Sequence, residues 1–177
     1  MLKATLTIFT LLILAASAAA SEVYIRAAQD LHDSVSHTAV GLSLNSSKPG
    51  FYWQGTGEVG AIIASRTGLD YRLEADAGWM FGKPEAALIP YALIGYRQWA
   101  IYEEPRSAPE SMYYGGGVRF TTGSMYISGS GNYYRDSEKW RPYAEIGAVA
   151  RQSLYGIYYD KSPFGADIVG IRYGYAY

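Results

Sequence analysis

The chain contains no cysteine, so neither disulfide bonds nor a thiolate metal site can contribute to its fold. It also has no surplus of positive charge, because 15 basic and 16 acidic residues give a formal net charge of −1. That balance argues against nucleic acid as a partner. Phosphate-binding glycine loops and zinc-ligand spacings are missing as well. We therefore expect no cofactor and no metal.

The N-terminal region has the pattern of a secretory signal peptide. Lys3 is followed by an apolar run from Ala4 to Ala16 and by the small residues 17–20. A membrane anchor is the alternative, but the run is shorter than the ~20 residues of a spanning helix, and no later run is long enough either. We expect residues 1–20 to be cleaved and residues 21–177 to form one exported domain.

The abundant residue types suit a membrane β-barrel. The chain has 18 Tyr, 20 Gly and 4 Trp, although its mean hydropathy is only −0.07. Amphipathic aromatic residues without long apolar runs are typical of strands that alternate between lipid and lumen.

The clearest alternation lies between Leu69 and Phe81. The odd-numbered residues of this segment are all apolar or aromatic, and the even-numbered ones include Asp70, Arg72, Glu74 and Asp76. On a helix these charges would spread around the circumference, so the pattern favours a strand. A basic residue at the bilayer midplane costs roughly 2–4 kcal/mol, so the charged face must point away from lipid.

The remaining chain divides into similar segments, about ten in all, whose connections alternate between longer and shorter. The longer series begins with residues 29–37 and ends with residues 161–165, and a tight reversal is expected at Arg151-Gln152. This predicts an all-β, transmembrane, antiparallel up-and-down barrel of about ten strands with periplasmic termini. Eight or twelve strands are the alternatives. Arg97 falls on the wrong side of its segment, which predicts a bulge.

The last segment, residues 167–177, is a strand with one aromatic face. An outer-membrane barrel is commonly closed by such a strand, and we expect its aromatic residues to be an assembly signal read by the barrel-insertion machinery. These residues are Tyr173, Tyr175 and Tyr177.

Short motifs between residues 23 and 60 follow one another in a recognisable order. They are Ile25-Arg26-Ala27, Gln29, Ala39-Val40-x-Leu42 and Pro49-Gly50-Phe51-Tyr52. In this order the region resembles the TorF-like porins, a family of exported bacterial barrels. The resemblance implies a porin-like barrel and carries over no catalytic residue.

The charges predicted to line the lumen are about half basic and half acidic. They either pair with one another and fill a narrow barrel, or they line a small aqueous path. Eight strands leave an interior just filled by side chains, so about ten strands exclude a wide diffusion pore and leave a structural barrel or a narrow channel. The residues are Arg26, Glu58, Asp70, Arg72, Glu74, Asp76, Arg119, Glu145, Arg151 and Arg172.

Aromatic residues near the strand ends are expected to form two interfacial girdles. The expected partners are therefore outer-membrane lipid, the insertion machinery and, for a channel, small solutes. The girdle residues are Trp53, Trp79, Phe81, Trp99, Tyr114, Tyr155 and Tyr175.

Two alternatives belong to other functional classes. His32, His37 and Asp33 are predicted in one surface loop, where they could serve an outer-membrane hydrolase as general base or metal ligands. A periplasmic ligand-binding barrel of lipocalin type would need the apolar face of residues 69–81 to be covered by protein. We favour the barrel without enzymatic activity in the bacterial outer membrane.

Overall fold

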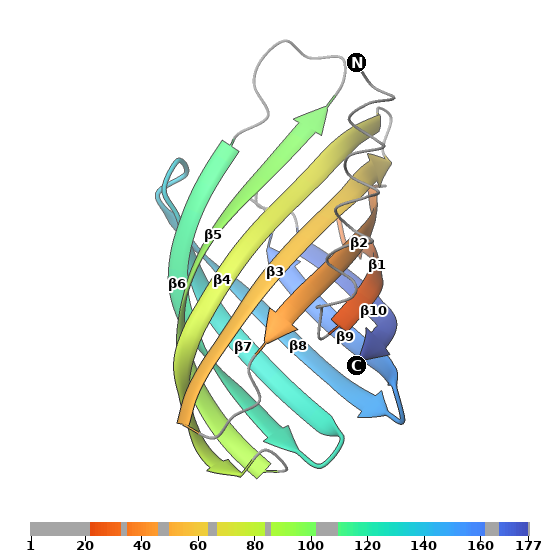
Figure 1. Ribbon diagram of the computed structural model, residues 1–177. Helices are drawn as coiled ribbons and strands as arrows, with labels where there is room; N and C mark the ends of the chain where they lie inside the picture. Colours follow the sequence, from red (N-terminus) through yellow and green to blue (C-terminus); the bar gives the residue numbers. More distant parts are fainter. Residues whose placement is uncertain are drawn as a thin grey trace.

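The computed structural model describes residues 22–32, 35–45, 50–63, 67–83, 86–101, 110–161 and 167–176, which form ten β-strands and no helix (Figure 1). Within this part of the chain, no helix is long and apolar enough to cross a membrane. The strands are β1 (Glu22–Asp30), β2 (Ser36–Asn45), β3 (Gly50–Ile63), β4 (Thr67–Lys83), β5 (Ala86–Ile101), β6 (Glu110–Thr122), β7 (Met125–Tyr134), β8 (Lys139–Ala150), β9 (Ser153–Lys161) and β10 (Asp167–Ala176).

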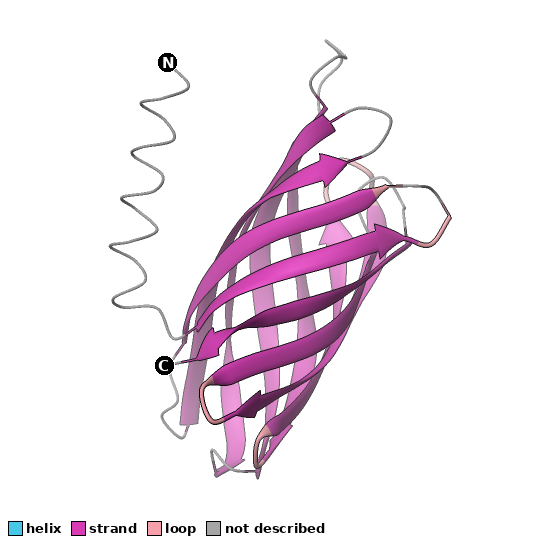
Figure 2. Cartoon of the chain, turned by 90° about the vertical axis from the view of Figure 1, so that its right-hand side faces the viewer, coloured by secondary structure: helices cyan, strands magenta, loops and turns pink. Residues whose placement is uncertain are grey.

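The strands close into one antiparallel barrel, in which neighbours in sequence pair with each other and β1 pairs with β10. Each of the ladders keeps a single register along its length. If the paired residues are followed from strand to strand around the barrel, the path returns to β1 about 12 residues away from its starting residue. This offset is the shear of the barrel, and it accompanies the tilt of the strands. Figure 2 shows this tilt. The predicted all-β barrel of about ten antiparallel strands is confirmed.

The connections alternate between the two ends of the barrel. The connections after β1, β3, β5, β7 and β9 lie at one end, called here the loop end, at the top of Figure 1. Those after β2, β4, β6 and β8 lie at the other, the turn end, where β1 also begins and β10 ends. Two turn-end reversals are two residues long and use left-handed backbone, at Gly123 with φ 54° and at Arg151 with φ 60°. The reversal predicted at Arg151-Gln152 is therefore present.

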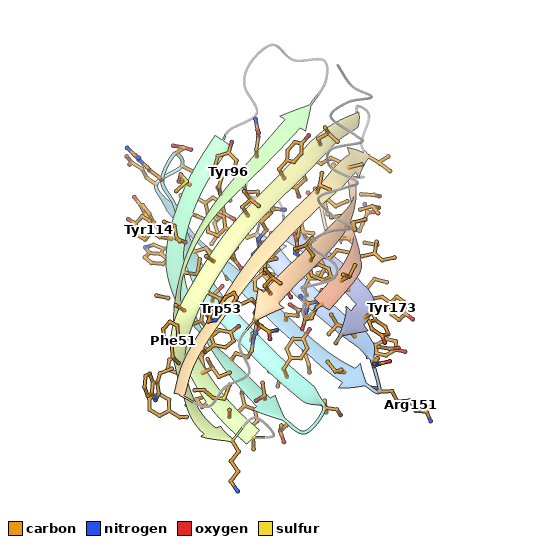
Figure 3. All side chains as sticks on the ribbon, in the orientation of Figure 1. Phe51, Trp53, Tyr96, Tyr114, Arg151 and Tyr173 are labelled. Atoms are coloured by element: carbon orange, nitrogen blue, oxygen red, sulfur yellow. The ribbon has the colours of Figure 1, made fainter. Side chains whose placement is uncertain are left out.

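The two faces of the wall follow the predicted parity. On β4, Leu73, Trp79 and Phe81 are exposed on the outside, while Arg72 and Asp76 are buried on the inside. Figure 3 shows the labelled Phe51, Trp53, Tyr114 and Tyr173 on the outer surface of the wall. Strands β3 to β6 are the longest, so this side of the barrel is the tallest.

Three predictions about single residues are wrong. No bulge accompanies Arg97, because β5 keeps one register with β4 and with β6. Arg97 faces inward together with Leu93, so the inner face of β5 is partly apolar. Arg151 lies in an exposed turn and does not line the lumen. His37 belongs to strand β2 and is buried, rather than lying in a surface loop with His32.

Some predictions fall on residues outside the described parts of the chain. They concern the signal peptide at residues 1–20, Asp33 of the proposed hydrolase and Tyr177 of the assembly signal. The side chain of Trp99 is also outside the described set.

Candidate functional site: the charged lumen

Arginines and carboxylates from all sides of the wall meet in the lumen. Apart from Arg151, the predicted lumen residues are buried or half-buried at inward-facing positions. The lumen also holds charged residues that the sequence analysis did not assign to it. They include Glu22, Arg97 and Asp160, together with Asp30 and Arg141.

Arg97 of β5 holds a carboxylate on each side. Its guanidinium donates to the two carboxylate oxygens of Asp70 on β4, at 3.2 and 3.0 Å, and to Oδ2 of Asp160 at 2.7 Å. Asp160 belongs to β9, so this contact crosses the lumen. The Arg97 side chain is only 6% exposed. A buried guanidinium is tolerated in such a place because several charge-assisted hydrogen bonds replace its hydration.

Arg26 of β1 pairs with Glu58 of β3. Its Nη1 lies 2.8 and 3.0 Å from the two carboxylate oxygens, and the Tyr24 hydroxyl donates to the same carboxylate at 2.7 Å. The guanidinium carbon of Arg26 also lies 3.6 Å from the centroid of the Tyr158 ring on β9, within cation–π range. This cluster joins three strands on one side of the lumen.

Arg72 and Glu74, both on β4, share Tyr113 of β6 as a partner. Arg72 donates to Glu74 at 2.8 Å and to the Tyr113 hydroxyl at 3.1 Å, and that hydroxyl donates to Glu74 at 2.8 Å. Each of the three groups therefore hydrogen-bonds to the other two, and such a connected network is stabilised in a low-dielectric site.

Arg172 of β10 lies between strands on both sides of the barrel seam. Its Nε is 3.1 Å from Glu145 of β8, and its Nη2 donates to Tyr126 of β7 at 3.0 Å and lies 3.5 Å from Glu22 of β1. Tyr126 and Tyr143 each donate to Glu145 at 2.6 Å. One guanidinium thus connects four strands around the β1–β10 junction.

Arg119 of β6 reaches across the turn-end part of the lumen to β3. Its Nη1 donates to the Tyr52 hydroxyl at 2.6 Å and to Gln54 Oε1 at 2.8 Å. Asp76 lies nearby with one buried carboxylate oxygen, Oδ1, that has no partner in the protein. The polar network therefore continues toward the turn end.

Apolar clusters adjoin the charged network near both ends of the barrel. Near the loop end, Ile62, Tyr158 and Ile168 form a buried cluster. Near the turn end, Tyr52 packs with Met80, and Ala87 and Ile89 complete that cluster. Between the two, the described residues leave cavities of about 20 and 30 Å³, each with room for about one or two water molecules. Side chains of the described residues therefore occupy much of the lumen.

Inward tyrosines fit this interior because glycines face them. Tyr24 lies directly across from Gly41, Tyr113 from Gly95, Tyr126 from Gly147 and Tyr158 from Gly170. A Cβ at any of these glycines would overlap the opposing ring. These pairs were not predicted from the sequence, where the aromatic residues were expected mainly in the girdles. The signal that could have indicated them is a glycine at an inward position of one strand next to a strand with an inward tyrosine.

The predicted girdle residues other than Trp99, whose side chain is outside the described set, lie on the outer wall. Trp53, Trp79, Phe81, Tyr155 and Tyr175 are exposed near the turn end. Near the loop end, Tyr114 stacks at a tilt on Tyr133, which in turn contacts Trp140, with ring centroids 5.3 and 5.6 Å apart.

The two histidines of the hydrolase alternative are not brought together. His32 is in the connection after β1 with its side chain 72% exposed, and its Nε2 lies 3.2 Å from Asp167. His37 faces the lumen, where it lines the smaller cavity with Asp70 and Asp160. Among the described residues, no group of three or more His, Asp or Glu could hold a metal ion.

No protein-family model matches the chain, and no curated protein matches its sequence. The resemblance to the TorF-like porins therefore stays a prediction.

Proposed function

We propose that the protein is an outer-membrane β-barrel with a structural role, whose lumen is closed to solutes. Its outer wall supports a membrane location, because exposed leucine, isoleucine and valine side chains cover the outside of the strands. Exposed aromatic side chains near both ends of the barrel match the positions of interfacial girdles. A soluble barrel would expose this apolar surface to water at a large cost.

The observation that carries the proposed closure is the cross-lumen network. Arg97 and Arg119 each reach to strands that are not their neighbours, and buried apolar clusters adjoin the network near both ends. A continuous aqueous path would require the buried ion pair of Arg97 with Asp160 and the hydrogen bonds of Arg119 with Tyr52 and Gln54 to separate, which is strongly unfavourable when a buried charge is left uncompensated. The barrel then serves as a rigid frame that presents its loop-end connections at one membrane surface.

Conductance across planar bilayers tests the closure. We expect no steady single-channel steps from the refolded wild-type barrel. The double variant R72A/R119A removes two guanidinium groups that line the larger cavity and should produce steps. This variant also shows that the preparation inserts. Steady steps from the wild type would contradict a closed lumen and favour the narrow channel.

Cell fractionation tests the location. We expect the protein in the outer-membrane fraction after extraction with urea, which removes peripheral proteins. Recovery in the soluble periplasm would overturn the membrane proposal. It would return the lipocalin-type barrel to consideration, although the filled lumen leaves little room for a ligand.

We also propose that the barrel is not an enzyme. The hydrolase alternative needs His32 and His37 in one site, but one is exposed at the rim and the other is buried in the lumen. Substituting both histidines by alanine should leave the cellular lipid profile and outer-membrane proteolysis unchanged. A change in either would favour the hydrolase.

A further inference from the structure

The lumen carries more negative than positive charge. Among the described side chains that face inward and are buried or half-buried, eight are carboxylates and six are guanidinium groups. Six of the carboxylates form the ion pairs described above, and the other two are Asp30 and Asp76. The guanidinium groups are those of Arg26, Arg72, Arg97, Arg119, Arg141 and Arg172. Charges inside proteins are paired or coordinate a metal ion, so a surplus of two carboxylates requires further positive charge.

The two carboxylates without an ion pair among the described residues differ in their surroundings. Asp30 is the last residue of β1, at the loop end, and its Oδ1 accepts the backbone N–H of His32 at 2.9 Å. Asp76 lies well inside the long strand β4 and is only 8% exposed. Its Oδ1 is buried and has no hydrogen-bond partner in the protein. The uncompensated charge in the interior of the barrel is therefore at Asp76.

Asp76 lines the larger lumen cavity, of about 30 Å³. Gln54 of β3 lies directly across from Asp76, and Thr56 lies across from Glu74. Carboxylate, amide and hydroxyl oxygens are the ligands that hard cations prefer. The oxygen-bearing side chains of β3, β4 and β7 that line this cavity are Gln54, Thr56, Glu74, Asp76, Ser128 and Ser130.

The guanidinium groups around this cavity do not neutralise Asp76 directly. Arg119 lines the cavity, but its Nη1 donates to Tyr52 and Gln54, and no ion pair joins it to Asp76. The charge of Arg119 is already one of the six, so it does not remove the surplus. A single unpaired carboxylate among neutral oxygens suits one positive charge, whereas a divalent ion usually takes more carboxylate ligands. The volume of one or two water molecules suits a small ion that has lost most of its hydration.

We propose that the lumen binds one monovalent metal cation, sodium or potassium, at Oδ1 of Asp76 in this cavity. The ion supplies positive charge where the cavity is too small for another arginine side chain. It links β4 to the oxygens of β3 and β7 and so stabilises the closed lumen. The site depends only on the interior of the barrel, so its test is independent of the membrane location.

Salt-dependent unfolding tests the binding of the ion. The barrel is refolded in detergent and unfolded in urea at mildly alkaline pH. Potassium or sodium chloride is varied, and choline chloride keeps the ionic strength constant, because choline is a monovalent cation too large for the cavity. We expect the ratio of folded to unfolded protein at a fixed urea concentration to rise about tenfold for each tenfold increase in the metal ion above its dissociation constant. Equal stability at all ratios of metal ion to choline would overturn the proposal and indicate a proton or water at Asp76.

Removing the charge of Asp76 tests where the ion binds. The variant D76N keeps the size of the side chain, and the dependence on potassium or sodium should disappear. The matched control is D30N, because Asp30 also has no ion pair among the described residues but does not line this cavity. D30N should keep the dependence. A dependence that persists in D76N, or that is lost equally in D30N, would overturn the assignment to Asp76.

Thallium(I), which replaces potassium at oxygen sites, locates the ion without any substitution. Crystals of the wild type soaked in thallium(I) acetate should show an anomalous-scattering peak beside Oδ1 of Asp76. The lack of such a peak in the lumen would overturn the proposal, whether or not D76N folds. A larger stabilisation by calcium chloride than by potassium chloride at the same concentration would overturn the choice of a monovalent ion.

Discussion

The guanidinium of Arg97 and its two carboxylates are stable only as a set. Replacing Arg97 by alanine leaves Asp70 and Asp160 in the lumen without their common cation. Removing one partner of a buried ion pair typically costs about 3–5 kcal/mol, and we expect R97A to lower the free energy of unfolding by that amount. The measurement is urea unfolding of the barrel in vesicles, followed by tryptophan fluorescence.

The matched control for R97A is Arg135→Ala, because Arg135 is exposed in the connection after β7. The free energy of unfolding of R135A should differ from that of the wild type by no more than about 0.5 kcal/mol. If R97A were as mild as R135A, the ion pairs across the lumen would contribute little, and the closure would depend on the apolar clusters instead.

Glycines facing tyrosines provide a second prediction at the scale of single residues. In Gly95→Ala the new methyl group would overlap the ring of Tyr113, which is fixed by Arg72 and Glu74. Overpacking of this kind costs about 1–3 kcal/mol. Gly55→Ala is the control, because nothing lies within 4 Å of the Cβ position at Gly55. We expect unfolding in urea to show G95A destabilised and G55A unchanged or slightly stabilised, and equal effects would show that Tyr113 moves freely.

Strand β4 allows the membrane location to be tested by energetics. Leu73 is 61% exposed at the middle of its outer face. If lipid covers this face, L73R should destabilise the barrel by about 2–4 kcal/mol. Leu31 is similarly exposed, at 59%, but lies in the connection after β1. L31R should therefore be nearly neutral. A neutral L73R in vesicles would mean that this face does not contact the bilayer core.

At the scale of strands, the sequence was most informative where the inner face was charged. The four charges of β4 determine which face is inward, and the structure shows the predicted alternation. On β5 the inner face carries Leu93 and Ile89 as well as Arg97, so polarity alone does not separate the faces. The inner position of Arg97 depends on register with β4 and β6, and register is a property of the closed sheet rather than of one segment.

The same limit applies to the lumen. Periodicity placed Arg26 and Glu58 on inward faces, but it could not show that they pair with each other or that Arg97 reaches Asp160 on the opposite wall. His37 was assigned to a loop because the residues before it are polar, whereas in the barrel it extends β2 and lines the lumen. These contacts depend on the curvature and stagger of the whole barrel.

Closure by β1 and β10 is the property of the whole molecule on which the lumen depends, since Arg172 makes its contacts across this seam. Because the chain has no cysteine, a single engineered pair can report on the seam. Ile25 and Tyr173 are direct partners on the outer face of β1 and β10. Directly opposed residues of antiparallel strands have Cα atoms about 4.5–5.5 Å apart, which suits a disulfide. We expect I25C/Y173C to oxidise readily, seen as faster migration of the denatured chain on a non-reducing gel.

The control pair I25C/I157C joins β1 to β9, which is not its neighbour in the barrel. It should remain reduced under the same conditions. A bond between β1 and β9, or none between β1 and β10, would mean that the barrel closes with a different set of strands. The contacts of Arg172 with Glu22 and Glu145 depend on this closure. Such a result would therefore also mean that these contacts do not form.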